Sequence, residues 1–117
     1  MAGGELSFQT EERDGVHVVH VSGPLDSMTY DAFRAQMDPL VNRVRARIVL
    51  DCERLSYVNS KGLTLLARYQ RIAVQSFTFF GVAALPARIV KSIEMLGMGR
   101  LLKSYATVAE ALQAARP

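Results

Sequence analysis

Residues 47–69, RIVLDCERLSYVNSKGLTLLARY, hold a short apolar run followed by an amphipathic segment, and this order decides the fold class. The run RIVLD over 47–51 predicts a central strand, because it is short and rich in branched apolar residues. From Gly62 onward, apolar residues recur at the spacing of one helix face, which predicts a helix. Residues 52–61 follow neither period, so we expect a loop between the strand and the helix.

The sequence upstream predicts a β-hairpin. Residues 6–12 alternate loosely between apolar and polar side chains, as an edge strand does. The Asp-Gly pair at 14–15 is a strong hairpin turn signal, and VHVVHVS over 16–22 should be the returning strand because it is rich in β-branched residues. The Gly-Pro pair at 23–24 is expected to end that strand.

Strands and helices alternate along the rest of the chain. In chain order, we expect a helix capped by Asp26 or Ser27, the strand RIVLD, a helix from Gly62, a strand over 76–82, a helix from Pro86 that ends at Gly97, a short strand over 101–105 and a helix opened by Thr107. This order predicts an α/β fold: a mixed sheet of four to five strands, with a mostly parallel core and an antiparallel edge hairpin, packed against about four helices. The 117 residues suffice for a single domain, 1–117, with its core over about 6–113.

Composition and charge exclude several functional classes. The chain has 14 basic and 11 acidic residues, a formal charge of +3, and its basic residues are scattered. The densest group, Arg43, Arg45 and Arg47, fits a helix end that leads into a strand, so we expect no direct nucleic-acid binding. The single cysteine, Cys52, excludes an intrachain disulfide and favours a reducing cytoplasm. We find no secretion signal and no apolar segment of the roughly 18 residues that span a membrane.

No motif for catalysis, metal binding or dinucleotide binding is complete. The serine nucleophile pattern G-x-S-x-G is nearest at 58–62, where valine replaces the first glycine. His17 and His20 are three residues apart, which on a strand points them to opposite faces and away from a shared metal ion. Residues 97–102 begin like the dinucleotide motif but lack its third glycine and follow a helix. We therefore expect a protein that is not an enzyme and needs neither metal nor cofactor.

Asn59 and Ser60 lie where the second helix is expected to start, and either side chain suits the N-cap. In one interpretation they only cap the helix. In the other, Ser60 accepts a phosphate, which adds about −1.5 to −2 charges at a helix N-terminus, where the dipole and the free N–H groups favour an anion. Lys61 would add a cation to such a site. The spacing by itself leaves both interpretations open.

The run over 47–69 resembles the signature of the STAS domains of bacterial anti-sigma factor antagonists. That signature is an apolar strand ending in aspartate, a small loop, an Asp-Ser-Ser/Ala-Gly-Leu segment and an apolar helix. Three other parts of the chain resemble the family in the same order: Gly-Pro-Leu-Asp-Ser at 23–27, the segment 93–98 with 101–102, and 107–112. The resemblance covers about residues 6–112, and four motifs in the correct order make it specific.

The resemblance implies a switch protein without catalytic activity of its own. In the family, an anti-sigma factor that is a serine kinase uses ATP to phosphorylate the serine at the helix start, here Ser60, and a serine phosphatase resets the cycle. The unphosphorylated form binds that kinase and so releases a sigma factor. Asp26 corresponds to the acidic residue beside the site, and Gly62 would let the backbone of the partner come close. The docking surface carried over comprises Asp26, Ser27, Met28, Asn59, Ser60, Lys61, Gly62 and Leu63.

Two residues depart from the family pattern. The aspartate before the serine is Asn59 here, which keeps the capping role but loses a charge, and the small residue after it is Lys61. The alternative function is that of a STAS subunit in a lipid or anion transport complex, without phosphorylation. By residue type, Met28 is expected in the core, like Met95 and Met98, although the resemblance places Met28 in the docking surface.

Overall fold

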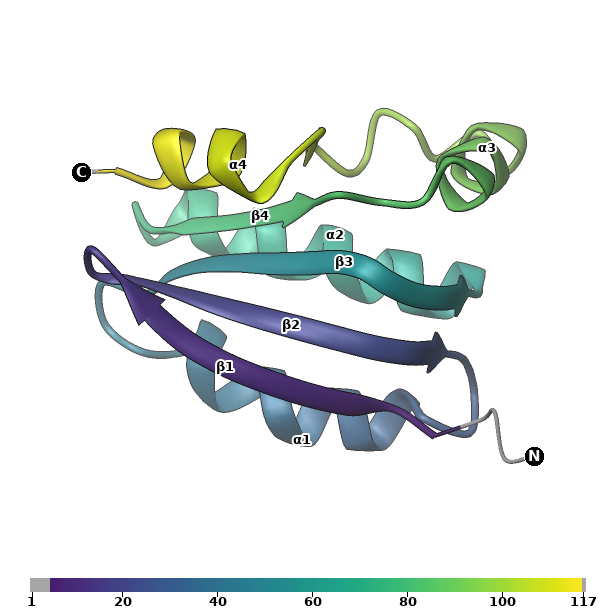
Figure 1. The fold of residues 1–117 in the computed structure, drawn as a ribbon, viewed down its shortest axis with the longest axis horizontal. Coiled ribbons are helices and arrows are strands. Elements are labelled where there is room, and N and C mark those ends of the chain that lie inside the picture. The colour runs from purple at the N-terminus through teal and green to yellow at the C-terminus, as the bar shows by residue number, and fades with distance from the viewer. Residues whose placement is uncertain (1–4, 117) are drawn as a thin grey trace.

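The computed structural model describes residues 5–116, which form one five-stranded sheet and four helices (Figure 1). The strands are β1 (Ser7–Arg13), β2 (Val16–Leu25), β3 (Arg47–Val58), β4 (Phe79–Ala83) and β5 (Ser104–Tyr105), and they lie in this order across the sheet. The helices are α1 (Tyr30–Val41), α2 (Ser60–Gln75), α3 (Ala87–Met95) and α4 (Val108–Ala115). Only β1 and β2 pair antiparallel, and the other pairs are parallel. The predicted fold class and element order are confirmed.

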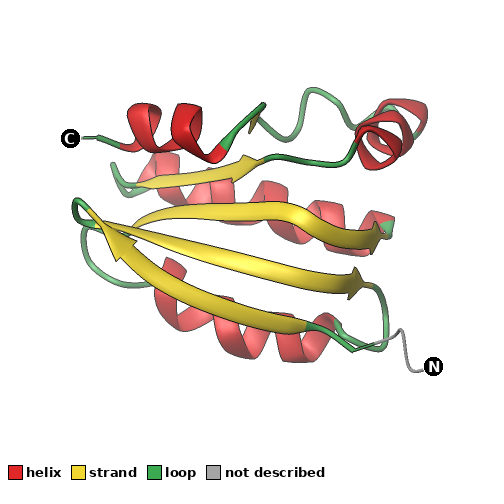
Figure 2. Ribbon diagram, viewed as in Figure 1, coloured by secondary structure: helices red, strands yellow, loops and turns green. Residues whose placement is uncertain are grey.

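The two faces of the sheet carry different helices. Phe33 of α1 and Leu66 of α2 share the main core cluster with Val19 and Leu50 of the sheet, and Figure 2 shows both helices behind the strands. Ala111 of α4 belongs to a second cluster on the opposite face, where it joins residues of β2, β3 and β4. Helix α4 covers only part of that face, so the polar side chains of β1 and β2 there stay open to solvent.

The antiparallel hairpin forms where the Asp-Gly pair predicts it. Asp14 and Gly15 both have positive φ, 52° and 82°. Two consecutive residues in that conformation make the turn whose twist matches the flanking strands. The hairpin aligns β1 with β2 from Ser7 opposite Ser22 to Arg13 opposite Val16.

The prediction that 23–24 ends the second strand is wrong, because β2 continues to Leu25. Strand β1 begins only at Ser7, opposite Ser22, so the last residues of β2 pair on the β3 side alone. Proline is tolerated in such a stretch because no neighbouring strand needs its missing N–H. Gly23 has φ 100°, and a Cβ there would lie 2.1 Å from the carbonyl oxygen of Glu5, so only glycine fits.

The prediction of a loop over 52–61 is also wrong. Strand β3 runs on to Val58, and α2 begins at Ser60, two residues before the expected start at Gly62. The alternation of apolar and polar residues that is typical of strands does not reveal this extension, because the buried residues Cys52, Leu55 and Val58 are three positions apart. Irregular pairing with β2 produces this spacing, and the register shifts twice along the extension.

Three smaller expectations are corrected. Helix α1 begins one residue after Thr29, not after Asp26 or Ser27, although the Asp26 side chain does organise the turn before it. Strand β4 starts at Phe79 rather than at residue 76. Among the methionines expected in the core, Met28 and Met95 are exposed, and only Met98 packs partly against the core.

Candidate functional site

The candidate site lies at the end of the sheet where β2 and β3 finish and α1 and α2 begin, on the right in Figure 1. The two strands are parallel, so their carboxyl ends reach the same edge. The backbone N–H of Asn59 donates to the carbonyl of Leu25 at 3.1 Å, which holds the two strand ends together. Folding therefore brings the segment around Asp26 next to the segment around Ser60, although 34 positions separate these residues in the sequence.

Asn59, not Ser60, caps α2. The Asn59 side-chain oxygen accepts a hydrogen bond from the backbone N–H of Gly62 at 2.8 Å, so it satisfies one of the donors that a helix start leaves free. Ser60 is the first residue of the helix, and its side chain is exposed. The Ser60 hydroxyl is thus not used as the cap and stands at the positive end of the helix dipole, where an added anion is stabilised.

Replacing Asn59 by alanine is expected to lower the free energy of unfolding by about 1 kcal/mol, because the N–H of Gly62 loses its acceptor. Urea unfolding followed by circular dichroism measures the change. Asn59→Asp is the matched control, because aspartate keeps the capping oxygen and should retain the wild-type stability. Equal loss in both variants would contradict the capping role.

The turn between β2 and α1 presents an apolar side chain beside the start of α2. One carboxylate oxygen of Asp26 accepts hydrogen bonds from the backbone N–H groups of Met28 and Thr29, at 2.9 and 3.0 Å. These hydrogen bonds fix the conformation of the turn, so the role of Asp26 in the structure is to position its neighbours Ser27 and Met28. Ser27 is exposed, and Met28 is 92% exposed, an unusual position for a large apolar side chain.

Lys61 links the starts of the two helices. Its ammonium nitrogen lies 4.1 Å from the centre of the Tyr30 ring, a cation–π contact between α2 and α1. Lys61 itself is exposed. This positive charge lies next to Ser60 in the sequence, and no acidic residue occupies the first turn of α2. The helix start therefore presents a positive charge and the positive end of its dipole together.

The structure corrects the roles expected for Gly62 and Leu63. Both are buried, Leu63 at 2% exposure. A Cβ added to Gly62 would lie 2.8 Å from Cγ of Leu25 and 3.0 Å from Cγ2 of Val58. Gly62 thus lets α2 pack closely on the ends of β2 and β3. Both residues are packed in the core beneath the exposed residues at the start of α2.

One exposed aromatic residue near this surface escaped the sequence analysis. Tyr57, the penultimate residue of β3, is 54% exposed. It falls in the segment expected to be a loop, so no periodicity marked it. At the adjoining Ser56, the carbonyl accepts a hydrogen bond from the Arg88 guanidinium at 3.1 Å, which ties α3 to this end of β3. We define the docking patch as the exposed residues Ser27, Met28, Tyr57, Ser60 and Lys61.

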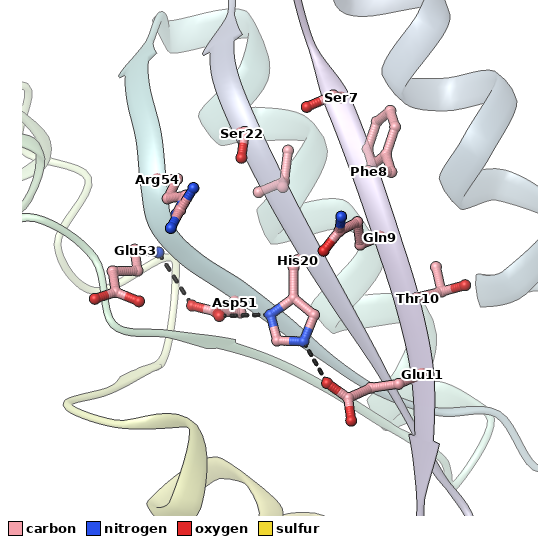
Figure 3. Close-up of a pocket in the computed structure, with 11 residues that line it drawn as sticks. Ser7, Phe8, Gln9, Thr10, Glu11, His20, Ser22, Asp51, Glu53 and Arg54 are labelled. Atoms are coloured by element: carbon pink, nitrogen blue, oxygen red, sulfur yellow. Dashed lines mark hydrogen bonds and ion pairs between the residues drawn. The ribbon is translucent and has the colours of Figure 1, made fainter.

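A second polar cluster lies on the open face of the sheet, in a hollow of about 880 Å³ (Figure 3). The imidazole of His20 lies between two carboxylates: Nε2 is 2.6 Å from Glu11 and Nδ1 is 2.7 Å from Asp51. His17 lies near Arg43 instead, which confirms that the two histidines face opposite sides. The contacts of His20 with Glu11 and Asp51 connect β2 to β1 and β3. Because both ring nitrogens of His20 are engaged in these contacts, neither nitrogen is free to act as a base.

His20→Gln is expected to destabilise the fold more at low pH than at high pH. The hydrogen bonds to Glu11 and then Asp51 raise the pKa of His20. The imidazolium therefore contributes fully below about pH 6.5, the pKa of an unfolded-chain histidine, and its contribution is lost as pH rises through the higher folded-state pKa. Urea midpoints of wild type and variant, measured from about pH 5.5 to 9, should converge. His17→Gln is the control, and a pH-independent difference for His20→Gln would contradict the prediction.

The remaining reactive groups are not arranged for chemistry. Within the described part of the chain, His, Cys, Asp and Glu side chains form no group of three or more that could hold a metal ion. Cys52 is fully buried, and this burial raises the pKa of its thiol, so it is an inert core residue. Among residues 5–116, no helix is both long and apolar enough to cross a membrane.

Comparison with known proteins finds a matching family model and similar bacterial proteins. The model of the STAS domain family matches residues 7–111. The anti-sigma F factor antagonist of Paenibacillus polymyxa is 31% identical over 109 residues, 92% of each chain. The crystal structure of an anti-sigma factor antagonist from Mycobacterium paratuberculosis matches with a TM-score of 0.83 and 28% identity, over 97% of this chain and 96% of that one. The Bacillus protein SpoIIAA in its phosphorylated form shares the fold, with a TM-score of 0.65 and 24% identity, over 94% of this chain and 100% of that one.

Proposed function

The chain belongs to the STAS domain family, and from this premise we propose that it is an anti-sigma factor antagonist whose binding to the anti-sigma factor is switched by phosphate on Ser60. Two relatives from different bacteria carry the name anti-sigma factor antagonist. That name describes a regulatory protein that acts by binding another protein, which agrees with the lack of a catalytic arrangement among the described residues.

The exposed hydroxyl of Ser60 is the single observation that carries the switch. It stands at the first position of α2, with the capping role already filled by Asn59. A kinase can therefore reach it, and a phosphate there would not remove a structural hydrogen bond of the helix cap. The helix dipole and the neighbouring Lys61 would favour the added charge, so the fold should tolerate both states.

The same phosphate would oppose binding. Unphosphorylated, the docking patch offers Met28 and Tyr57 as exposed apolar side chains together with the neutral hydroxyl of Ser60. Burying such a surface against a partner is favourable. A phosphate adds about −1.5 to −2 charges and three oxygens in the middle of that contact, and its water must be removed before the partner can dock. The switch thus needs no conformational change in the antagonist itself.

The proposal extends to the enzymes that set the state of Ser60. The anti-sigma factor is a serine kinase that transfers the γ-phosphate of ATP to the Ser60 oxygen, whose proton is released, and a serine phosphatase hydrolyses the ester. Both reactions would take place in the cytoplasm. Both reactions require only that Ser60 of this chain be accessible, because the ATP-binding site belongs to the kinase.

Labelling with candidate kinases tests the proposal. The full chain is incubated with ATP and each anti-sigma factor kinase of the host, and phosphopeptides are read by mass spectrometry. We expect phosphate on Ser60 and none on a Ser60→Ala variant. Ser27→Ala, another exposed serine of the docking patch, is the matched control and should be labelled like the wild type. Equal labelling of wild type and Ser60→Ala would reject Ser60 as the acceptor.

The transport-subunit alternative makes a different prediction. It expects the same surface to bind an ABC-type ATPase and Ser60 to stay unmodified. The antagonist function is favoured because the relative at 31% identity is named an antagonist and aligns over nearly its whole length. Affinity purification from the native host separates the two, since either an anti-sigma kinase or a transporter ATPase should co-purify.

A further inference from the structure

A second candidate surface lies at the opposite end of α2. Two turns meet there, one between α1 and β3 and one between α2 and β4, and a groove of about 580 Å³ lies between them. Ile72 of α2 lines the groove, and Val44 and Phe77 contribute apolar side chains from the two turns. Because α2 has 16 residues, about 24 Å separate this groove from Ser60. A protein bound at the docking patch would leave the groove free.

Phe77 occupies a backbone position that normally belongs to glycine. The N–H of Thr78 donates to the carbonyl of Ala73 and that of Phe77 to Val74, at 2.8 and 3.3 Å, the hydrogen-bond pattern that closes a helix with a left-handed residue. Phe77 is that residue, with φ 57°. Helix α3 closes with the same pattern, but there the left-handed residue is Gly97, with φ 71°.

The side chain of Phe77 makes no packing contact that would compensate this backbone strain. Its side chain is 93% exposed, and Val44 across the groove is 90% exposed. A bulky residue at positive φ is a genuine conformational outlier, and a large apolar side chain in water gains nothing from the fold. Glycine or asparagine would serve the turn better. Within residues 5–116, no packing compensates the conformational cost of Phe77.

The groove is also basic. Arg43, Arg45 and Arg47 line it, and Asp and Glu are missing from its described lining. Within residues 5–116, none of these three arginines forms an ion pair. Arg43 only approaches the ring of His17, at 3.3 Å, and Arg47 donates to the carbonyl of Ala115 at 2.6 Å. The guanidinium groups of Arg43 and Arg45 therefore remain to give the hollow a positive potential, whereas that of Arg47 is engaged with α4 on the other face of the sheet.

We propose that this basic groove binds an acidic segment of a protein partner, with one large apolar side chain of that segment seated between Phe77 and Val44. The carboxylates of the segment would pair with Arg43 and Arg45, and burial of the apolar side chain would supply affinity. A hollow suits a side chain, whereas a flat bilayer would contact only its rim, so the geometry favours a peptide over an anionic membrane. This site is independent of the proposed switch at Ser60.

Fluorescence anisotropy with a synthetic probe tests the proposal. The probe is a short labelled peptide with a central Phe-Leu pair flanked by glutamates, and the control peptide carries lysines instead. We expect the acidic peptide to bind the full chain and the basic one not to bind. Phe77→Asn and Arg45→Glu should each weaken binding at least about tenfold. Met95→Ser, which removes an exposed apolar side chain elsewhere, and Ser60→Asp should leave it unchanged.

The stability of Phe77→Asn provides a second readout. Asparagine suits the left-handed position, so the urea midpoint should stay at or above the wild-type value. The proposal is overturned by a lowered midpoint, which would make Phe77 a structural residue. It is also overturned if the acidic peptide does not bind the full chain, or if Phe77→Asn binds the peptide as tightly as the wild type does. NMR amide shifts locate the bound peptide, and shift changes outside residues 41–47 and 72–78 would contradict the proposed site. Binding of phosphatidylglycerol vesicles alone would likewise overturn the proposal.

Discussion

A Ser60→Asp variant is expected to bind the anti-sigma factor at least about 100-fold more weakly than the wild type, and Ser60→Ala is expected to bind as tightly. Ser60 is exposed at the first position of α2 and belongs to the docking patch. A carboxylate there must lose its hydration water when the partner docks. A partner surface that is complementary to the neutral hydroxyl provides no cation to compensate this desolvation cost. Alanine removes only a small polar group.

Titration calorimetry with the purified anti-sigma factor measures both affinities. Ser76→Asp is the matched control, because Ser76 is an exposed serine that follows the other end of α2. The same charge is added next to the other end of the same helix, far from the docking patch. A similar loss in both variants would mean that net charge, not position, controls binding. Wild-type affinity in Ser60→Asp would show that Ser60 lies outside the interface.

A Gly62→Val variant is expected to lose about 3 kcal/mol of unfolding free energy, since the added methyl groups enter a filled space. A Cβ at this position would already lie 2.8 Å from Leu25 and 3.0 Å from Val58, both of which are core residues. The start of α2 would have to move away from the strand ends. Because Ser60 and Lys61 lie on that turn, the docking patch should be displaced as well.

Urea unfolding of the full chain measures the loss, with Gly62→Ala as an intermediate case that still folds. Gly99→Val is the control, because a Cβ at Gly99 has only Cγ of Glu94 within 4 Å, at 3.9 Å. That variant should lie within about 0.5 kcal/mol of the wild type. If Gly62→Val were as stable as the wild type but failed to bind the partner, Gly62 would belong to the interface and not to the core.

The candidate site could be predicted in its chemistry but not in its geometry. A hydroxyl at a helix start is a local feature of a few consecutive residues, but only the resemblance to the STAS signature selected Ser60 as the phosphate acceptor. The capping function could not be divided between Asn59 and Ser60, because both residue types suit it. The choice depends on where α2 begins, and that start is set by the pairing of β3 with β2.

Long-range contacts also decide which neighbouring side chains are exposed. Met28 was expected in the core, yet it is 92% exposed because the turn closed by Asp26 directs it outward. The resemblance placed Leu63 in the docking surface, yet it packs in the core under the strand ends. Tyr57 was hidden in a stretch without period. The burial of Leu63 and the place of Tyr57 in β3 depend on strand pairing between segments that lie far apart in the sequence.

By itself, the sequence determined the order of strands and helices, the hairpin turn and the mixed sheet. These features follow from periodicity and turn chemistry, which act over a few neighbouring residues. Only the tertiary structure decided the length of β2 and β3, the inward role of Gly62, the contact of His20 with two strands and the exposure of Phe77. Those depend on which distant segments share a register and a face, and no local pattern encodes that pairing.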